Sequence, residues 1–273
     1  MGDWCVVIVG LGNQGKKRQA VVLGAGDTIA AAVDPLNSIW KDVRSVPLSH
    51  YDAALVCVPA QEASSIVEYL VANKKHVLVE KPFEPAVPAH DSVLYVAYNH
   101  RFEPHVARLK RLIDSGVLGK LYHCRMFYGN GTAENVRGSW RDEWDNSVES
   151  EIGSHLVDLN DFLFVGHRIA TRISGKRWEN RKIDHAIIDF SGEPTIQHEV
   201  TYLSWKNAFT IDLLAERGSA HVDGLTKWGA SMFTHRVRQS PPGVPTETRH
   251  VLVEPDGTWM AEYAYFKKLC GAG

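Results

Sequence analysis

The sequence predicts an α/β protein in which a doubly wound parallel sheet is followed by an α+β domain with an open, largely antiparallel sheet. Three observations support this fold class. Apolar runs alternate with helical segments over about the first hundred residues, closely spaced glycines follow the first apolar run, and in the second half extended runs follow one another directly.

The first apolar run, residues 4–9, ends in glycines with the spacing Gly10-x-Gly12-x-x-Gly15. Such a run is typical of a buried strand that turns into a helix, here expected over residues 13–23. Gly10 permits a tight turn, Gly12 lets a pyrophosphate approach the backbone, and Gly15 lets the helix pack closely on the strand. The unpaired N–H groups at the helix N-terminus, where Asn13 and Gln14 lie, are expected to bind the phosphates.

The second apolar run, residues 28–33, ends at Asp34, about 20 residues beyond the glycines. A carboxylate at this strand end is placed to accept the hydroxyls of an adenosine ribose, and it repels a 2′-phosphate. We therefore expect a dinucleotide site that favours NAD over NADP. The side chains of Lys41 and Arg44 follow within a few residues and could turn toward the same site, which would favour NADP. The alternative interpretation of Asp34 is a turn residue before Pro35.

Three further apolar strands are expected within residues 51–59, 75–79 and 92–97, with a crossover helix over 62–75. Parallel strands place their carboxyl ends at the ligand-binding edge. Pro59, Glu80 and Lys81 stand at such ends and are predicted to contact the cofactor. A solvated surface charge is the alternative for Lys81.

The alternation stops near Glu103, which predicts domains at residues 1–103 and 104–273. A helix is expected over 105–115, a strand over 120–128, a loop over 129–146 and a helical period over 153–164. Strand following strand then indicates an antiparallel sheet. Its expected strands lie at 186–190, 196–203, 209–215 and 219–222, and the chain closes with a helix over 258–269.

Composition limits the classes of function. The 273 residues are 44% hydrophobic and 23% charged, with a net charge of −2, which gives no general electrostatic reason to bind nucleic acid or a membrane surface. The four cysteines are far apart, and two lie in apolar runs, so we expect reduced thiols, no metal site and a cytoplasmic protein. No signal peptide or membrane span is expected.

Four motifs resemble the glucose–fructose oxidoreductase / inositol dehydrogenase / MocA family. They are the glycine motif, the segment from His76 to Pro82 with Glu80-Lys81-Pro82, the segment Tyr98-Asn-x-Arg101-Phe102, and Glu151-x-Gly153-x-His155-x-x-Asp158. The resemblance implies a nicotinamide-binding Rossmann domain, a second domain whose sheet forms the substrate cleft, and a homo-oligomer through that sheet. The tracts at 205–209 and 224–229 resemble members that act in surface-carbohydrate synthesis.

The resemblance also implies roles for single residues. Lys81 corresponds to the active-site lysine and His155 to the acid/base histidine, while Glu151 stands where the family usually has aspartate. Imidazole suits proton transfer near neutral pH, and Glu151 shares a helix face with His155 if the segment is helical. An ordinary surface Glu–His pair is the alternative. The candidate substrate-binding residues are Lys81, Tyr98, Asn99, Arg101, Trp140, Arg141, His155 and Asp158.

The leading hypothesis is an NAD-dependent oxidoreductase that transfers hydride to or from a carbon of a sugar, polyol or nucleotide sugar. One alternative is a non-catalytic NAD-binding regulator of the same fold. Another is a lyase or glycosidase in which bound NAD is transiently reduced. The pairing of Lys81 with His155 favours catalysis over regulation, because a sensor needs neither residue.

Overall fold

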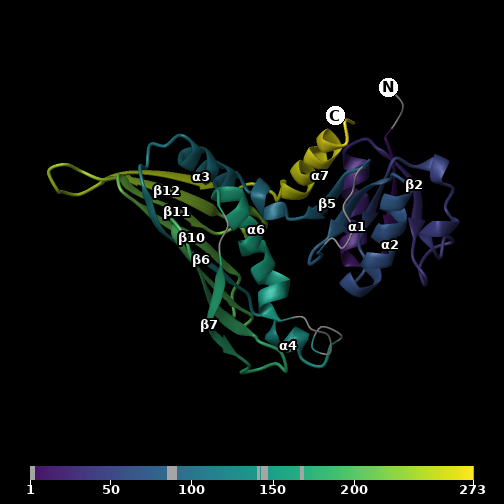
Figure 1. Ribbon diagram of the computed structural model, residues 1–273, viewed down its shortest axis with the longest axis horizontal. Helices are drawn as coiled ribbons and strands as arrows, with labels where there is room; N and C mark the ends of the chain where they lie inside the picture. Colours follow the sequence, from purple (N-terminus) through teal and green to yellow (C-terminus); the bar gives the residue numbers. More distant parts are fainter. Residues whose placement is uncertain (1–3, 85–90, 140–141, 143–146, 167–168, 273) are drawn as a thin grey trace. The chain divides into compact units, whose positions relative to one another are not determined.

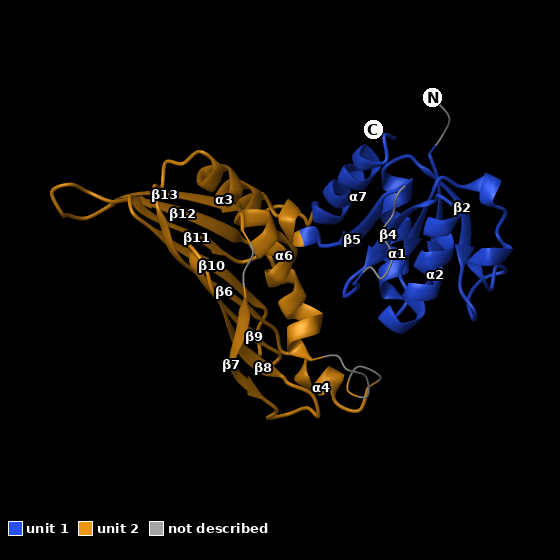
Figure 2. Ribbon diagram, viewed as in Figure 1, with its two compact units in different colours: residues 1–99, 257–273 blue, residues 100–256 orange. Residues whose placement is uncertain are grey.

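The computed structural model describes residues 4–84, 91–139, 142, 147–166 and 169–272. The chain forms two compact units, shown in Figure 2: unit 1 comprises residues 1–99 and 257–273, and unit 2 comprises residues 100–256. The sequence predicts a division near Glu103, with every later residue in the second domain. The C-terminal segment instead packs with unit 1, where Glu262 of that segment forms a buried ion pair with Arg18.

Unit 1 contains a five-stranded parallel sheet in the order β2-β1-β3-β4-β5. Its strands are near-continuous apolar runs because both faces of the sheet are buried. Its elements are β1 (Cys5–Val9), α1 (Asn13–Gly24), β2 (Thr28–Val33), the short 3₁₀ turns η1 (Val43–Ser45) and η2 (Leu48–His50), β3 (Ala53–Val56), α2 (Ala60–Ala72), β4 (His76–Glu80), β5 (Leu94–Ala97) and α7 (Thr258–Leu269).

Helices cover both faces of this sheet. On one face Val67 and Leu70 of α2 pack against Val7 and Val9 of β1 and their neighbours. On the other face α1 and the C-terminal helix α7, which is yellow in Figure 1, pack against the alternate strand residues through Val22, Tyr263 and Phe266. This is the doubly wound arrangement that the first half of the sequence predicts.

Unit 2 contains an eight-stranded sheet in the order β13-β12-β11-β10-β6-β9-β8-β7. Only the β6–β9 pair is parallel, so the fold-class prediction of a largely antiparallel second sheet is confirmed. Its elements are η3 (Asn99–Phe102, whose first residue belongs to unit 1), α3 (Pro104–Asp114), β6 (Leu121–Gly129), α4 (Ala133–Val136), a π-helical turn η4 (Glu149–Gly153), α6 (Ser154–Leu163), β7 (Ala170–Lys176), β8 (His185–Phe190), β9 (Thr195–Thr201), β10 (Ala208–Ala215), β11 (Gly218–Asp223), η5 (Thr226–Trp228), β12 (Ser231–Val237) and β13 (Thr246–Leu252).

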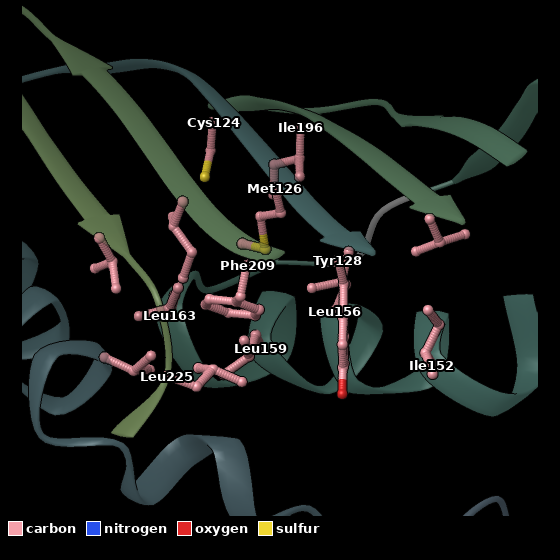
Figure 3. Packing of buried hydrophobic residues seen from close by; sticks show 14 of the residues in the cluster. Cys124, Met126, Tyr128, Ile152, Leu156, Leu159, Leu163, Ile196, Phe209 and Leu225 are labelled. Carbon is pink, nitrogen blue, oxygen red and sulfur yellow. The ribbon is translucent and has the colours of Figure 1, made fainter. Parts of the chain in front are cut away.

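The core of unit 2 lies between this sheet and helices α3 and α6. Alternate residues of β6, namely Cys124, Met126 and Tyr128, are buried against Leu156 and Leu159 of α6. Figure 3 shows the Tyr128 side chain extending from its strand toward α6, with the hydroxyl oxygen at the end away from the sheet. Within the described ranges, no helix combines the length and apolar character needed to cross a membrane.

Candidate functional site

Unit 1 contains a cavity of about 410 Å³ at the carboxyl ends of β1, β2 and β3. Ligands of open parallel sheets bind at this edge. Four of the predicted cofactor residues line the cavity: Gly10, Gly12, Asp34 and Pro59. The remaining lining residues are Val9, Val33, Pro35, Lys41, Asp42, Val43, Arg44, Cys57, Val58, Glu62, Ser65 and Ile66.

The glycine motif has the geometry that phosphate binding requires. Gly10 has a φ of +91°, which L side chains rarely adopt, and a Cβ on Gly15 would overlap the Gly10 carbonyl oxygen. A Cβ on Gly12 would instead meet no protein atom within 4 Å, although Gly12 borders the cavity. Gly12 is also the N-cap of α1, and no side chain caps it. The first N–H groups of α1 are therefore open to an anion.

Asp34 joins the end of β2 to the glycine loop. One carboxylate oxygen accepts the Leu11 N–H at 2.8 Å, and the other accepts the N–H groups of Leu36 and Asn37 at 2.9 and 2.8 Å. These bonds, with that of Leu11 foremost, lower the pKa of Asp34. The side chain is therefore an ionised acceptor held at the wall of the cavity, and it also serves as the turn residue that the alternative interpretation expects.

Two cations also lie at this cavity. The Arg44 guanidinium is 3.3 Å from Asp42 and donates to the Ser65 carbonyl at 3.1 Å, so it is held on the surface of unit 1. Lys41 is exposed. The carboxylate of Asp34 is the charged group that the glycine loop binds, through the Leu11 N–H.

Glu80, predicted as a cofactor residue, forms an ion pair with Arg18 of α1 at 2.7 Å. The same guanidinium binds Glu262 of α7, also at 2.7 Å. Lys81 follows directly after this anchored strand end and is half-buried. Asn99, predicted as a substrate residue, donates its side-chain N–H to the Thr258 hydroxyl at 2.7 Å and so helps to hold the start of α7.

Unit 2 gathers a second set of polar residues around His155, which lies in the first turn of α6 and is 6% exposed. Its ring stacks on the ring of His100, with centroids 4.0 Å apart and planes 19° apart. Tyr128 lies beside both rings, at 5.4 Å from His100 and 6.0 Å from His155. Lys227 of η5 reaches the same place: its ammonium is 3.2 Å from His100 Nε2 and 3.3 Å from the Tyr128 hydroxyl.

The two predicted acidic residues of this segment have partners. Glu151 lies in the π-helical turn and accepts the Tyr202 hydroxyl proton at 3.0 Å. Asp158 accepts two hydrogen bonds from the Arg101 guanidinium, one of them from Nε at 2.7 Å. Burial raises the pKa of Asp158 to about 6, against the opposing effect of Arg101. Arg101 and Asp158, two predicted substrate residues, thus form one unit.

The predicted residues therefore fall into two groups. Gly10, Gly12, Asp34 and Pro59 line the cavity of unit 1, and Arg101, Glu151, His155 and Asp158 lie on η3, η4 and α6 of unit 2. Tyr98 is half-buried after β5, and Asn13 and Gln14 are exposed in the first turn of α1. Trp140 and Arg141 lie outside the described residues. The described part of the chain contains no group of three or more His, Cys, Asp or Glu able to hold a metal ion.

Sequence reasoning missed three residues of the His155 cluster: His100, Tyr128 and Lys227. His100 occupies the unspecified position of the Tyr98-Asn-x-Arg101-Phe102 motif, and Tyr128 reads as an ordinary strand aromatic. Lys227 belongs to a short turn between Gly224 and Gly229. Two signals were available, the polar Thr226-Lys227 between strand-forming segments and the resemblance of the tract 224–229, and neither indicates a partner for Lys227.

Comparisons with known proteins agree with the two-unit organisation. Residues 5–100 match the family described as an oxidoreductase family with an NAD-binding Rossmann fold, and residues 106–221 match the GFO/IDH/MocA C-terminal domain.

Two curated relatives of this chain are named sugar or polyol dehydrogenases. A D-xylose 1-dehydrogenase [NADP(+)] of Haloarcula marismortui is 28% identical over 190 residues, which cover 63% of this chain and 50% of that protein. An inositol 2-dehydrogenase of Rhizobium meliloti is 23% identical over 137 residues, 42% of each protein. The chain thus matches about half or less of the length of these curated relatives.

The fold is also similar to that of a solved structure, levoglucosan dehydrogenase in complex with NADH. The TM-score is 0.84 at 17% identity, and the alignment covers 100% of this chain and 91% of the other. At this identity the likeness concerns the fold alone.

The uncapped start of α1 and the open space beside Gly12 fit the pyrophosphate of a dinucleotide.

Proposed function

Because the chain belongs to the GFO/IDH/MocA family of NAD-binding oxidoreductases, we propose that it oxidises or reduces an alcohol carbon of a sugar or polyol with NAD as the hydride carrier. The observation that carries the proposal is the cavity of unit 1, where an uncapped helix, an open glycine and an anchored carboxylate meet. The names of the curated relatives support the sugar or polyol class. Nucleotide sugars belong to the same chemical class and are included in the test.

The residues of unit 1 would bind the dinucleotide. The N–H groups at the start of α1 would hold the pyrophosphate, with Asn13 and Gln14 in that first turn. Asp34 would accept the ribose hydroxyls with the lone pairs that its backbone bonds leave, and its charge would repel a 2′-phosphate. The proposed preference for NAD over NADP rests on Asp34. The names of the relatives do not supply it, because the D-xylose dehydrogenase is named for NADP.

When bound, the nicotinamide supplies the hydride chemistry, and the proton is left to the protein. We assign His155 as the acid/base that takes or returns the hydroxyl proton, since imidazole changes charge near neutral pH. Lys81 would donate a hydrogen bond to the reacting oxygen. Glu151, which accepts a hydrogen bond from the Tyr202 hydroxyl, would stabilise the imidazolium form of His155. Arg101 and Asp158, with Tyr98, would contact further hydroxyl groups of the substrate.

A panel of sugars, polyols and nucleotide sugars tests the reaction class. The expected result is net formation of NADH from NAD with at least one substrate, lost in His155→Ala and kept in His123→Ala. His123 is a suitable control because it lies on β6 of the same unit and its ring hydrogen-bonds to the Thr195 hydroxyl. Conversion of a substrate with no net NADH would indicate the lyase or glycosidase chemistry. Tight NAD binding without turnover of any substrate would indicate the regulator.

A further inference from the structure

The stacked pair His100–His155 is the feature of unit 2 that the proposed function does not use fully. The assigned acid/base, His155, lies flat against a second imidazole that is 1% exposed. Two like-charged rings at this separation repel each other strongly, so a stack of this kind is favourable only while at least one ring is neutral. The structure indicates which ring is neutral.

The contact with Lys227 bears on which ring nitrogen of His100 carries the proton. A lysine ammonium has three donors and no acceptor, so the contact of 3.2 Å between Lys227 Nζ and His100 Nε2 requires a lone pair on Nε2. The proton of the neutral ring is then on Nδ1. The Tyr128 hydroxyl accepts from the same ammonium at 3.3 Å, which fixes the direction from which Lys227 approaches.

The position of Lys227 is itself set by buried contacts. The preceding residue, Thr226, donates both its backbone N–H and its hydroxyl to the carboxylate of Glu103, at 3.1 and 3.0 Å. Glu103 is 2% exposed, and its backbone N–H donates to the His100 carbonyl at 3.2 Å. The turn that carries Lys227 and the turn that carries His100 are thus joined by one residue, Glu103, through its carboxylate and its backbone N–H. The Lys227 ammonium also lies 4.6 Å from the centre of the Trp228 ring.

We propose that Lys227 is a positioning residue of the active site: it holds His100 as the neutral Nδ1–H tautomer, and the flat neutral ring of His100 orients the imidazole of His155. This inference rests on the proposed function in one respect, the role of His155. The tautomer itself is a property of unit 2 and needs neither cofactor nor substrate. Lys227 thereby gives the turn between Gly224 and Gly229 a role in catalysis without contact with the reacting atoms.

Nitrogen NMR of histidine-labelled protein measures the tautomer directly, because protonated and unprotonated ring nitrogens resonate far apart. His100→Gln assigns the resonances. In the wild type we expect an unprotonated Nε2 and a protonated Nδ1 for His100. Lys227→Met should move the population toward the Nε2–H tautomer, and Lys227→Arg, which keeps a donor, should restore the wild-type pattern. Lys176→Met, an exposed lysine of β7 in the same unit, should leave it unchanged.

Kinetics complete the test. Lys227→Met should lower kcat about 10- to 100-fold through misorientation of His155, with the Kd of NAD unchanged, and Lys227→Arg should recover most of it. An unchanged His100 tautomer in Lys227→Met would overturn the inference whatever the activity. A changed tautomer with wild-type kcat, while His155→Ala is inactive, would overturn the positioning role and leave the proposed function standing. Wild-type turnover in His155→Ala would overturn both.

Discussion

Arg18 in helix α1 and Glu262 in helix α7 form a buried ion pair at 2.7 Å although 244 residues separate them in sequence. The Arg18 side chain is 1% exposed and that of Glu262 is fully buried. The same guanidinium binds Glu80 at the end of β4 and lies 4.3 Å from the centre of the Trp259 ring. One side chain therefore joins the C-terminal helix to the strand end that precedes Lys81.

This relationship predicts a large loss of stability in Arg18→Met. Removing one partner of a buried ion pair leaves an uncompensated charge and costs about 3–5 kcal/mol. Two carboxylates, Glu80 and Glu262, would be left in this variant. Urea unfolding of unit 1 should show the loss, while Lys16→Met, an exposed neighbour on the same helix, should unfold like the wild type. A loss below about 1 kcal/mol would show that the ion pairs do not hold α7 in place.

The glycine motif gives a pair of substitutions with opposite outcomes. Gly12→Val should fold normally, because its side chain enters open space, but should abolish dinucleotide binding by occupying the site of the pyrophosphate. Gly15→Ala should instead destabilise unit 1, because its Cβ would overlap the Gly10 carbonyl oxygen. Calorimetric titration with NAD and thermal unfolding separate the two effects. Unchanged NAD affinity in a folded Gly12→Val protein would refute the cofactor site.

Asp34 should determine the choice between NAD and NADP. In Asp34→Ala the repulsion of a 2′-phosphate disappears, so the ratio of NADP to NAD affinity should rise about 10-fold or more. The Asp34→Ala variant also loses the acceptor of the Leu11 N–H. Asp34→Asn is therefore the better-matched comparison, because it removes the charge while its amide oxygen can still accept one backbone N–H. Equal affinity ratios in all three proteins would leave Asp34 as a turn residue only.

Asp158 should give the stability of unit 2 a measurable pH dependence. Burial raises its pKa from 3.8 to about 6. At a pH between these two values, the Asp158 carboxyl is therefore protonated in the folded state and ionised in the unfolded state. Stability is therefore highest below the unfolded pKa and falls as pH rises through the folded pKa, by about 3 kcal/mol in total. Asp158→Asn should remove this slope between about pH 4 and pH 6. Identical slopes in both proteins would mean that Arg101 already keeps the carboxylate ionised.

The fold could be predicted where the local sequence pattern of a single strand or helix is clear. The strands of unit 1 are near-continuous apolar runs, as buried parallel strands are, and the family resemblance is confirmed by matches to both parts of the chain. The strands β7, β12 and β13 were not recognised individually. β7 and β13 lie at the edges of the sheet and expose most of their residues, which weakens the alternation on which strand prediction depends.

The sequence also predicted the helix at 258–269 with its bounds, but not its partner. A local pattern specifies a helix, whereas its placement depends on Arg18 and Glu80, which are nearly two hundred residues or more away. The same limit applies to the residues of the candidate site. The glycines and Asp34 are recognisable because a ligand imposes their spacing, while Lys227 and His100 meet only through the fold, and no spacing between residues 100 and 227 indicates it.

The last prediction concerns Lys81 and His155, which we propose act in the same chemical step. General acid–base help contributes about 10²–10⁴-fold in rate, so Lys81→Met and His155→Ala should each lower kcat by that order with NAD affinity nearly unchanged. Residues that act together on one transition state are strongly non-additive. The double variant should therefore be little slower than the slower single variant. Lys74→Met, an exposed lysine of unit 1 paired with Asp91, is the matched control. If the two losses instead multiplied, Lys81 and His155 would contribute independently of each other, because independent contributions to the barrier add as free energies.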